Sequence, residues 1–201
     1  MNLMQNEFSS SALAALKENQ SVVLIFFGAG IVDQSRFDSL KERQPERIVD
    51  FGIAEQAGIG FAAGLAIAGK IPIIHTHTAF LIERAYEQIK IDFGYQNLGC
   101  NLIGLGGSLE FTFLGPTHNC PSDVPILKLI PNMEIVVPGT VEEFRILFRS
   151  HYDNGKPTYF RLSRELNSQS YPVIPYKAHV IKKGKKATII VIGPMLNYIL
   201  R

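Results

Sequence analysis

A single carboxylate, Glu55, opens a stretch of the chain in which residues 56–69 hold no charge. The stretch has the length of a helix, yet it contains Gly58, Gly60 and Gly64, and each interior glycine costs a helix about 1 kcal/mol relative to alanine. We therefore expect another helix or a partner subunit to pack very close to its backbone. A carboxyl group beside such a surface is poorly solvated, which suits it to hold or share a proton.

Other reactive side chains give weaker patterns. His75 and His77 project from the same face of an extended segment and could bind a metal together, but no third ligand is near, so no metal site is predicted. Cys100 and Cys120 form neither a disulfide framework nor a paired metal motif. The Gly28-Ala29-Gly30 segment lacks the third glycine of a dinucleotide fingerprint.

Short apolar runs alternate with helical patterns along the chain, which predicts a doubly wound α/β fold whose mostly parallel sheet is covered by helices on both faces. Thr140 with Glu143 forms a capping box that starts one helix. Strands are expected at 22–27, 71–74, 102–105, 135–137 and 159–162, and helices at 11–18, 55–68, 80–92, 122–129 and 140–150.

The composition excludes several classes of protein. The 201 residues carry 20 Lys plus Arg against 18 Asp plus Glu, so no nucleic acid or acidic surface is expected as a partner. No segment holds the ~20 unbroken apolar residues of a membrane span. The first eleven residues lack an apolar signal core, so we expect a cytoplasmic, reducing location and no membrane association. The basic run 182–186 is expected to be a solvated turn.

The chain is expected to divide near residue 165. Residues 1–165 carry the alternating pattern of one domain, whereas residues 166–181 are rich in Pro, Ser and Tyr, as is typical of a linker. Residues 187–193 are expected to form a fresh strand, so 166–201 would be a linker and the first strand of a truncated C-terminal domain, unless that strand docks elsewhere.

Several blocks of sequence resemble the transketolase family of thiamine-diphosphate enzymes, in its pyrimidine-binding domain. The resemblance covers roughly residues 10–165 in unbroken order, which is far more specific than any one motif. It rests on Gly52-Ile53-Ala54-Glu55-Gln56, Gly69-Lys70-Ile71-Pro72, Arg84-Ala85-Tyr86-Glu87-Gln88, Gly115-Pro116-Thr117-His118, Pro131-Asn132-Met133 and Leu162-Ser163-Arg164.

The resemblance implies roles for individual residues. The glutamate that matches Glu55 contacts N1′ of the cofactor's aminopyrimidine and takes part in the proton transfers that activate the cofactor. Phe80 matches an aromatic residue that packs on this ring, with an ordinary core position as the alternative. His77 stands where the family usually has a stacking Phe, so an imidazole would stack there more weakly.

The substrate side is implied in the same way. His118 matches a histidine that faces substrate oxygens, and Arg164 matches an arginine that holds a substrate phosphate. The alternative for His118 is a structural histidine beside a proline turn, and the alternative for Arg164 is a surface ion pair. Phe113-Leu114 replaces an acidic pair that reads a sugar hydroxyl, so we expect a sugar-like acceptor with fewer hydroxyl groups.

The family's Gly-Asp-Gly motif for the diphosphate and Mg²⁺ is absent from the sequence. The resemblance therefore implies the pyrimidine-binding subunit of a split, transketolase-like enzyme that transfers a two-carbon ketol unit. Thiamine diphosphate would be shared with a diphosphate-binding partner chain that holds Mg²⁺, in a homodimer or heterotetramer. A deoxyxylulose-phosphate-synthase-like subunit, a 2-oxoacid dehydrogenase β-type subunit and a non-catalytic scaffold relative are the alternatives.

Overall fold

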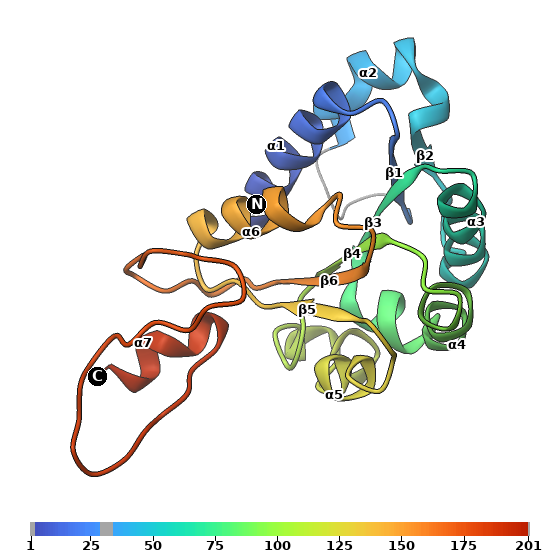
Figure 1. Cartoon of the computed structure of the whole chain (residues 1–201). Helices are drawn as coiled ribbons and strands as arrows, with labels where there is room; N and C mark the ends of the chain where they lie inside the picture. Colours follow the sequence, from blue (N-terminus) through green and yellow to red (C-terminus); the bar gives the residue numbers. More distant parts are fainter. Residues whose placement is uncertain (1–2, 29–33, 201) are drawn as a thin grey trace.

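The computed structural model, which describes residues 3–28 and 34–200, has one sheet of six parallel strands (Figure 1). The strands are mostly buried and apolar, so helices cover both faces of the sheet. The predicted doubly wound α/β fold is confirmed. In spatial order the strands are β2 (Ile48–Asp50), β1 (Val22–Phe26), β3 (Ile71–His77), β4 (Cys100–Leu105), β6 (Pro157–Leu162) and β5 (Glu134–Val136).

Two hydrophobic layers separate the sheet from its helices. On one face, Phe8, Phe144, Phe148 and Phe160 form the centre of the first layer. On the other face lie the helix that Glu55 opens and the segments after β3, around the buried Phe93. The first face carries α1 (Leu3–Glu18), α2 (Asp38–Arg43) and α6 (Val141–His151), and the second carries α3 (Glu55–Ile67), α4 (Tyr86–Gln88) and α5 (Asp123–Leu127).

The sequence patterns placed most elements correctly. Helix α6 begins where the capping box predicts, because the backbone N–H of Glu143 donates to Thr140 Oγ1 at 3.1 Å. Helix α1 starts earlier than predicted, at Leu3. The short edge strand β2 was missed, since three residues give too little periodicity to recognise.

The helix predicted over 80–92 is wrong in detail. The chain forms two π-helical segments there, Ala79–Glu83 and Ile89–Tyr95, on either side of the short α4. In the first segment the backbone N–H of Arg84 donates to the carbonyl of Ala79, five residues back, at 3.3 Å. Wide turns of this kind occur frequently at functional sites, because they alter which side chains share a face.

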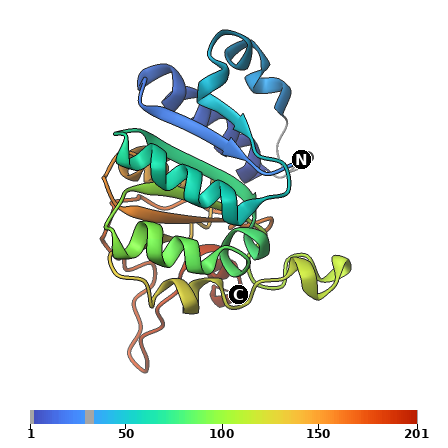
Figure 2. The same cartoon turned by 90° about the vertical axis from the view of Figure 1, so that its right-hand side faces the viewer.

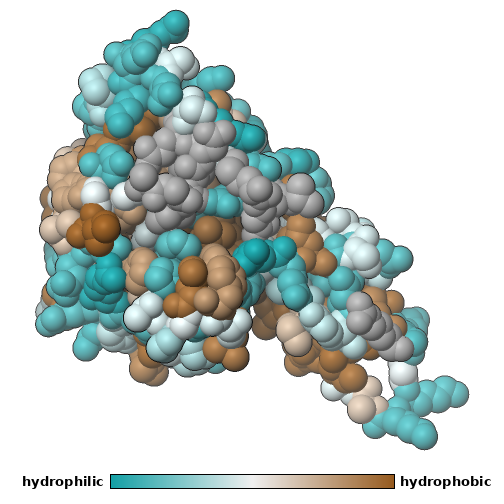
Figure 3. All heavy atoms as spheres, turned by 180° about the vertical axis from the view of Figure 1, so that it is seen from behind, coloured by the Kyte–Doolittle hydropathy of each residue, from teal (hydrophilic) through white to brown (hydrophobic). Residues whose placement is uncertain are grey.

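Residues 166–200 form an arm that leaves the body of the molecule and ends in α7 (Leu196–Ile199) (Figure 1). The predicted strand over 187–193 is wrong for this chain: residues 187–192 lie in no strand of the sheet that the structure describes. Ile189, Ile190 and Ile192 are exposed there, and Figure 3 shows hydrophobic atoms along the arm. Tyr176 ties the arm to the body by donating to Glu134.

Among residues 3–28 and 34–200, every helix is too short or too polar to cross a membrane.

Candidate functional site

The residues with predicted roles gather where the parallel strands end. Phe80 follows β3, His118 lies in the long connection after β4, and Arg164 follows β6, while Glu55 opens the helix after β2. The strand order reverses between β1 and β3, and ligands of open α/β sheets bind at such a switch point, outside the carboxyl ends of the strands. Figure 2 shows the yellow-green connection after β4 extending from this end of the molecule.

The turn before α3 places Glu55. Asp50, at the end of β2, accepts hydrogen bonds from the backbone N–H groups of Gly28 and Gly52, and Gly52 has φ +65°, which suits a glycine. Residues 29–30 of the weak Gly28-Ala29-Gly30 pattern lie outside the described residues. The chain then enters α3 with Glu55 as its first residue and with the side chain 3% exposed. The helix dipole at this end favours a negative charge.

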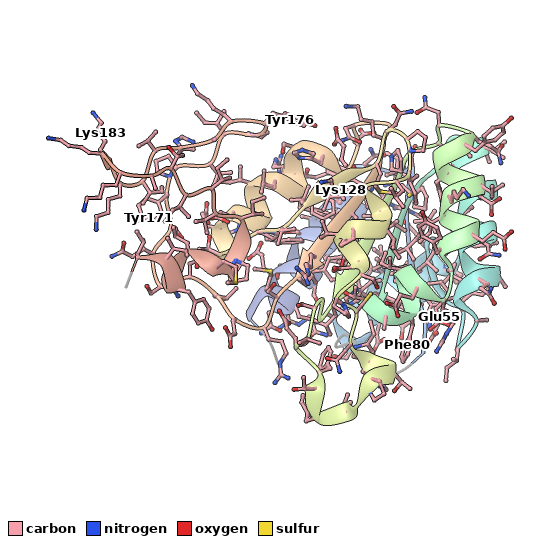
Figure 4. The ribbon with its side chains drawn as sticks, turned by 90° about the horizontal axis from the view of Figure 1, so that it is seen from below. Glu55, Phe80, Lys128, Tyr171, Tyr176 and Lys183 are labelled. Atoms are coloured by element: carbon pink, nitrogen blue, oxygen red, sulfur yellow. The ribbon has the colours of Figure 1, made fainter. Side chains whose placement is uncertain are left out.

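Arg84 is the cation that meets the buried carboxylate. Its Nη1 donates to Glu55 Oε2 at 2.7 Å, and its guanidinium carbon lies 4.2 Å from the centre of the Phe80 ring. Glu55 and Phe80 accordingly lie close together at one edge of the body (Figure 4). The sequence motif that contains Arg84 predicted no role for it; its position four residues after Phe80, in a helical pattern, was the available signal.

A cluster of rings adjoins this ion pair. The His77 ring meets Phe80, Phe111 and His118 edge-on, with centroid distances of 5.7, 5.0 and 5.6 Å. Phe80 also contacts His118 at 5.0 Å. The structure thus brings together the three ring residues singled out from the sequence and adds Phe111, for which the sequence predicted no role.

Burial and the neighbouring His118 lower the pKa of His77 below its usual value, so its imidazole is neutral at neutral pH. Its Nδ1 is buried and has no hydrogen-bond partner among the described residues. Thr117 Oγ1 lies 2.9 Å from His118 Nδ1, which ties that ring to its own loop. An unpaired ring nitrogen in the cluster leaves a place for a polar atom of a ligand.

His75 does not join His77 in the site. Its ring is fully buried against Phe8, with Nδ1 2.9 Å from the carbonyl oxygen of Ile103. Burial lowers the pKa of His75 to about 4. The described residues contain no group of three or more His, Cys, Asp or Glu side chains placed to hold a metal ion.

Arg164 closes the far side of the cluster. Its guanidinium lies 5.5 Å from the ring centres of both Phe111 and Phe113, and its backbone N–H donates to Glu110 Oε2 at 2.9 Å. Burial raises the pKa of Glu110. Phe113 and Leu114, the pair that replaces acidic residues, are largely exposed in this region. The Arg164 guanidinium therefore lies beside two aromatic rings, next to the partly buried Glu110 carboxylate.

A buried polar network beneath the site was not found from the sequence. Tyr159 donates to Asp123 Oδ2 at 2.9 Å, Thr78 Oγ1 lies 3.4 Å from the Tyr159 hydroxyl, and Arg161 Nε lies 3.0 Å from the same Asp123 oxygen. Thr78 directly follows His77, so the network ties the ends of β3 and β6 to α5. The residues of this network are far apart in the chain, so no short sequence motif contains them together. Burial raises the pKa of Tyr159 well above its usual value.

The glycines of α3 divide into two kinds. A Cβ on Gly58 would lie 2.1 Å from a ring carbon of Phe27, so this glycine admits a side chain of the chain's own core. Gly60 and Gly64 face outward, and a Cβ on Gly64 would meet nothing within 4 Å. The close neighbour of Gly58 is therefore the Phe27 side chain of this same chain. A Cβ on Gly60 would lie 3.8 Å from Asp92 Oδ2, at ordinary van der Waals distance, and only Gly64 of these three meets nothing.

Residues 6–169 match the family model described as the transketolase pyrimidine-binding domain. The chain belongs to this family. The resemblance recognised in the sequence is thereby confirmed, and the buried Glu55 with its cluster of rings lies inside the matched range of this pyrimidine-binding domain.

Individual relatives agree with this assignment. The domain is 33% identical over 153 residues to an apulose-4-phosphate transketolase subunit from Actinobacillus succinogenes, covering 74% of this chain and 49% of that protein. It is 35% identical over 180 residues to 1-deoxy-D-xylulose-5-phosphate synthase from Actinobacillus pleuropneumoniae, covering 85% of this chain and 27% of that one.

A solved split-gene transketolase, described as an inactive beta4 tetramer, superposes with a TM-score of 0.82 at 26% identity. The superposition covers 98% of this chain and 64% of that one. The chain therefore spans less than two thirds of the length of these relatives.

Proposed function

We propose that this chain is the pyrimidine-binding subunit of a thiamine-diphosphate-dependent, transketolase-like enzyme that moves a two-carbon ketol unit from a ketose to an aldose. One observation carries the proposal. Glu55 is almost completely buried and pairs with Arg84, which stacks on Phe80. The Phe80 ring in turn contacts the rings of His77 and His118. A carboxylate next to aromatic rings fits a flat ligand with polar ring nitrogens.

The residues present fit the aminopyrimidine half of the cofactor. Phe80 and His77 offer rings for the flat heterocycle, and Glu55 would accept or return a proton at its N1′ atom. His77 Nδ1, which has no described partner, is free to bind a polar atom of a ligand. When bound, thiamine diphosphate supplies the carbon nucleophile that adds to the substrate carbonyl. This chain's residues orient the ring, exclude water and handle the proton.

We place the diphosphate and its Mg²⁺ on a second chain. The proposal is supported by the missing Gly-Asp-Gly motif and by the relatives' names, one a transketolase subunit and one a split-gene transketolase. The description of the latter as an inactive beta4 tetramer agrees with a subunit that needs a partner. The active form would be a heterotetramer, and this chain by itself would form a homodimer or a larger homo-oligomer.

His118 and Arg164 would bind opposite ends of the substrate. His118 reaches the ring cluster, where the reacting carbonyl would lie, and Arg164 offers a forked guanidinium to a phosphate or a similar anion. The side chains of Phe113 and Leu114 offer no hydrogen bond. A hydroxyl left unpaired there costs about 1–3 kcal/mol, which favours a sugar-like acceptor with fewer hydroxyl groups.

Two related activities are alternatives on the same fold. Condensation of the deoxyxylulose-phosphate-synthase type is supported by the similarity to such a synthase. A 2-oxoacid dehydrogenase β-type subunit is the other. The Gly115-Pro116-Thr117-His118 block favours the transketolase type.

A non-catalytic scaffold is the alternative from a different class. The His at position 77 and the apolar pair at 113–114 favour it, whereas the retained Glu55 and His118 oppose it. We also propose a cytoplasmic location, and a division of the chain into a domain over 1–165 and an arm over 166–201 that belongs to a C-terminal unit.

Reconstitution tests the proposed function. The purified chain is titrated calorimetrically with thiamine diphosphate and Mg²⁺, first alone and then with a diphosphate-binding chain from the same organism. We expect micromolar binding and ketol transfer only for the mixture, because each chain holds half of the cofactor. Micromolar binding by this chain alone would refute the split site, and a mixture that binds the cofactor without any transfer would favour the scaffold.

A further inference from the structure

Arg84 makes two contacts that a surface ion pair does not explain. Its guanidinium hydrogen-bonds one oxygen of Glu55 at 2.7 Å and lies over the face of Phe80 at 4.2 Å. Both partners belong to the proposed aminopyrimidine site. One planar cation therefore contacts Glu55, the proposed proton-handling group, and Phe80, the proposed stacking ring, together.

The local backbone explains how one side chain reaches both. Arg84 follows the π-helical segment Ala79–Glu83, and its N–H bonds to the carbonyl five residues back. Arg84, four residues after Phe80, stacks on that ring while its guanidinium extends across to the start of α3. Arg84 remains 40% exposed although Glu55 is 3% exposed. The pair thus lies at the edge of the core, with its cation partly in contact with solvent.

The hydrogen bond has a directional consequence for the carboxylate. Because Nη1 binds Oε2, rotation of the Glu55 carboxylate is restricted and Oε1 is the oxygen left for another partner. Phe80 is held in turn between Arg84 and His118, whose ring lies 5.0 Å away. Arg84 therefore fixes the orientation of two groups and needs no direct contact with a reacting atom.

We propose that Arg84 is a positioning residue of the cofactor site, which orients the Glu55 carboxylate toward the aminopyrimidine and holds Phe80 against the same ring. The inference rests on the proposed function. A purely structural ion pair would matter for folding alone, whereas a positioning residue matters for proton transfer in a protein that folds and binds cofactor normally.

Two substitutions separate these roles. Arg84→Met keeps much of the length of the side chain and its packing on Phe80 but removes the charge. Arg84→Lys keeps the charge but loses the planar fork, so one hydrogen bond to Glu55 survives and the stacking weakens. Arg145→Met is the matched control. Arg145, on α6, is similarly exposed (52%) and binds Glu7 of α1 at 2.9 Å, away from the site.

The first readout uses the isolated chain without cofactor. Nitrogen-15 NMR should detect slowed rotation and exchange of the Arg84 guanidinium in the wild type. The slowing should disappear in Glu55→Gln and persist in Arg145→Met. A wild-type guanidinium that rotates as freely as in Glu55→Gln would overturn the inference, because the ion pair would not restrain either group.

The second readout uses the complex with its diphosphate-binding partner. We expect Arg84→Met to bind thiamine diphosphate within about threefold of wild type but to exchange the cofactor C2 proton at least tenfold more slowly, with an altered pH profile. Arg84→Lys should recover part of the rate, and Arg145→Met should match wild type. If Arg84→Met exchanged the C2 proton at the wild-type rate, the positioning role of Arg84 would be overturned while the proposed function would stand. Equal losses of exchange rate in Arg84→Met and Arg84→Lys, together with a lower free energy of unfolding in both, would also overturn that role. Absence of exchange in the wild-type complex would instead overturn the proposed function.

Discussion

Replacement of Glu55 by glutamine separates the chemistry of the site from its stability. Gln keeps the shape of the side chain, but it carries no charge to hold the Arg84 guanidinium and it cannot exchange a proton. Breaking a fully buried ion pair costs about 3–5 kcal/mol. Here Glu55 is buried but Arg84 is 40% exposed, so the unpaired guanidinium can be solvated by water. We therefore expect the free energy of unfolding to fall by only about 1 kcal/mol.

Proton exchange at the cofactor should fall far more. A positioned acid or base contributes about 10²–10⁴-fold, so Glu55→Gln should slow C2 hydrogen–deuterium exchange, followed by proton NMR in the reconstituted complex, by a factor in that range. Cofactor affinity should change little, because most contacts persist. Glu87→Gln, a carboxylate on α4, is the control.

Fast exchange in both wild type and Glu55→Gln would remove Glu55 from the proton path. Slow exchange in both would favour the scaffold alternative, with His77 and Leu114 as the first positions to revert. Fast exchange in the wild type alone is the outcome that supports an enzyme.

Three further outcomes are expected. Gly60→Leu, on the exposed face of α3, should weaken self-association or partner binding in sedimentation while the chain remains folded; unchanged association would make this face an ordinary solvent surface. His75 has a pKa of about 4 in the folded chain against 6.5 as its ordinary value, so the unfolded chain binds the extra proton between these pH values and stability falls as pH drops through that window. The loss should be about 2 kcal/mol between pH 7 and pH 5 in urea denaturation and should vanish in His75→Gln; equal losses in both would contradict it. Leu114→Asp in the complex should shift kcat/KM by about tenfold toward a 2-hydroxyaldehyde phosphate over its 2-deoxy analogue, and an unchanged ratio would place Leu114 away from the substrate.

The sequence predicted the sheet because its strands are continuous apolar runs, which are typical of buried parallel strands. It also predicted the start of α6, since a capping box acts within four residues. The sequence could not predict the edge strand β2, because three residues are too few to show an alternating pattern. It could not predict the π-helical segments either, because a π turn differs from an α turn only in which carbonyl accepts each hydrogen bond.

The candidate site divides in a similar way. Glu55, His77, Phe80, His118 and Arg164 could be named because they lie in or beside blocks of family sequence, and their catalytic and binding roles stay predictions. The contacts of Arg84 with Glu55 and of Tyr159 with Asp123 join residues 29 and 36 positions apart. Such contacts depend on how strands are ordered in the sheet, and local patterns carry no information about that order.

The strand order also affects how the chain is made. Strand β4 pairs with β3 on one side, but its other neighbour, β6, begins only at Pro157. At about 5–20 residues per second, a ribosome needs several seconds to reach β6 after finishing β4 at Leu105. During that interval a strand whose six residues are all buried in the finished fold has one open edge, which other unfinished chains can join. Newly made chains should therefore be most prone to aggregate, and most dependent on chaperones, while residues 106–157 are being translated.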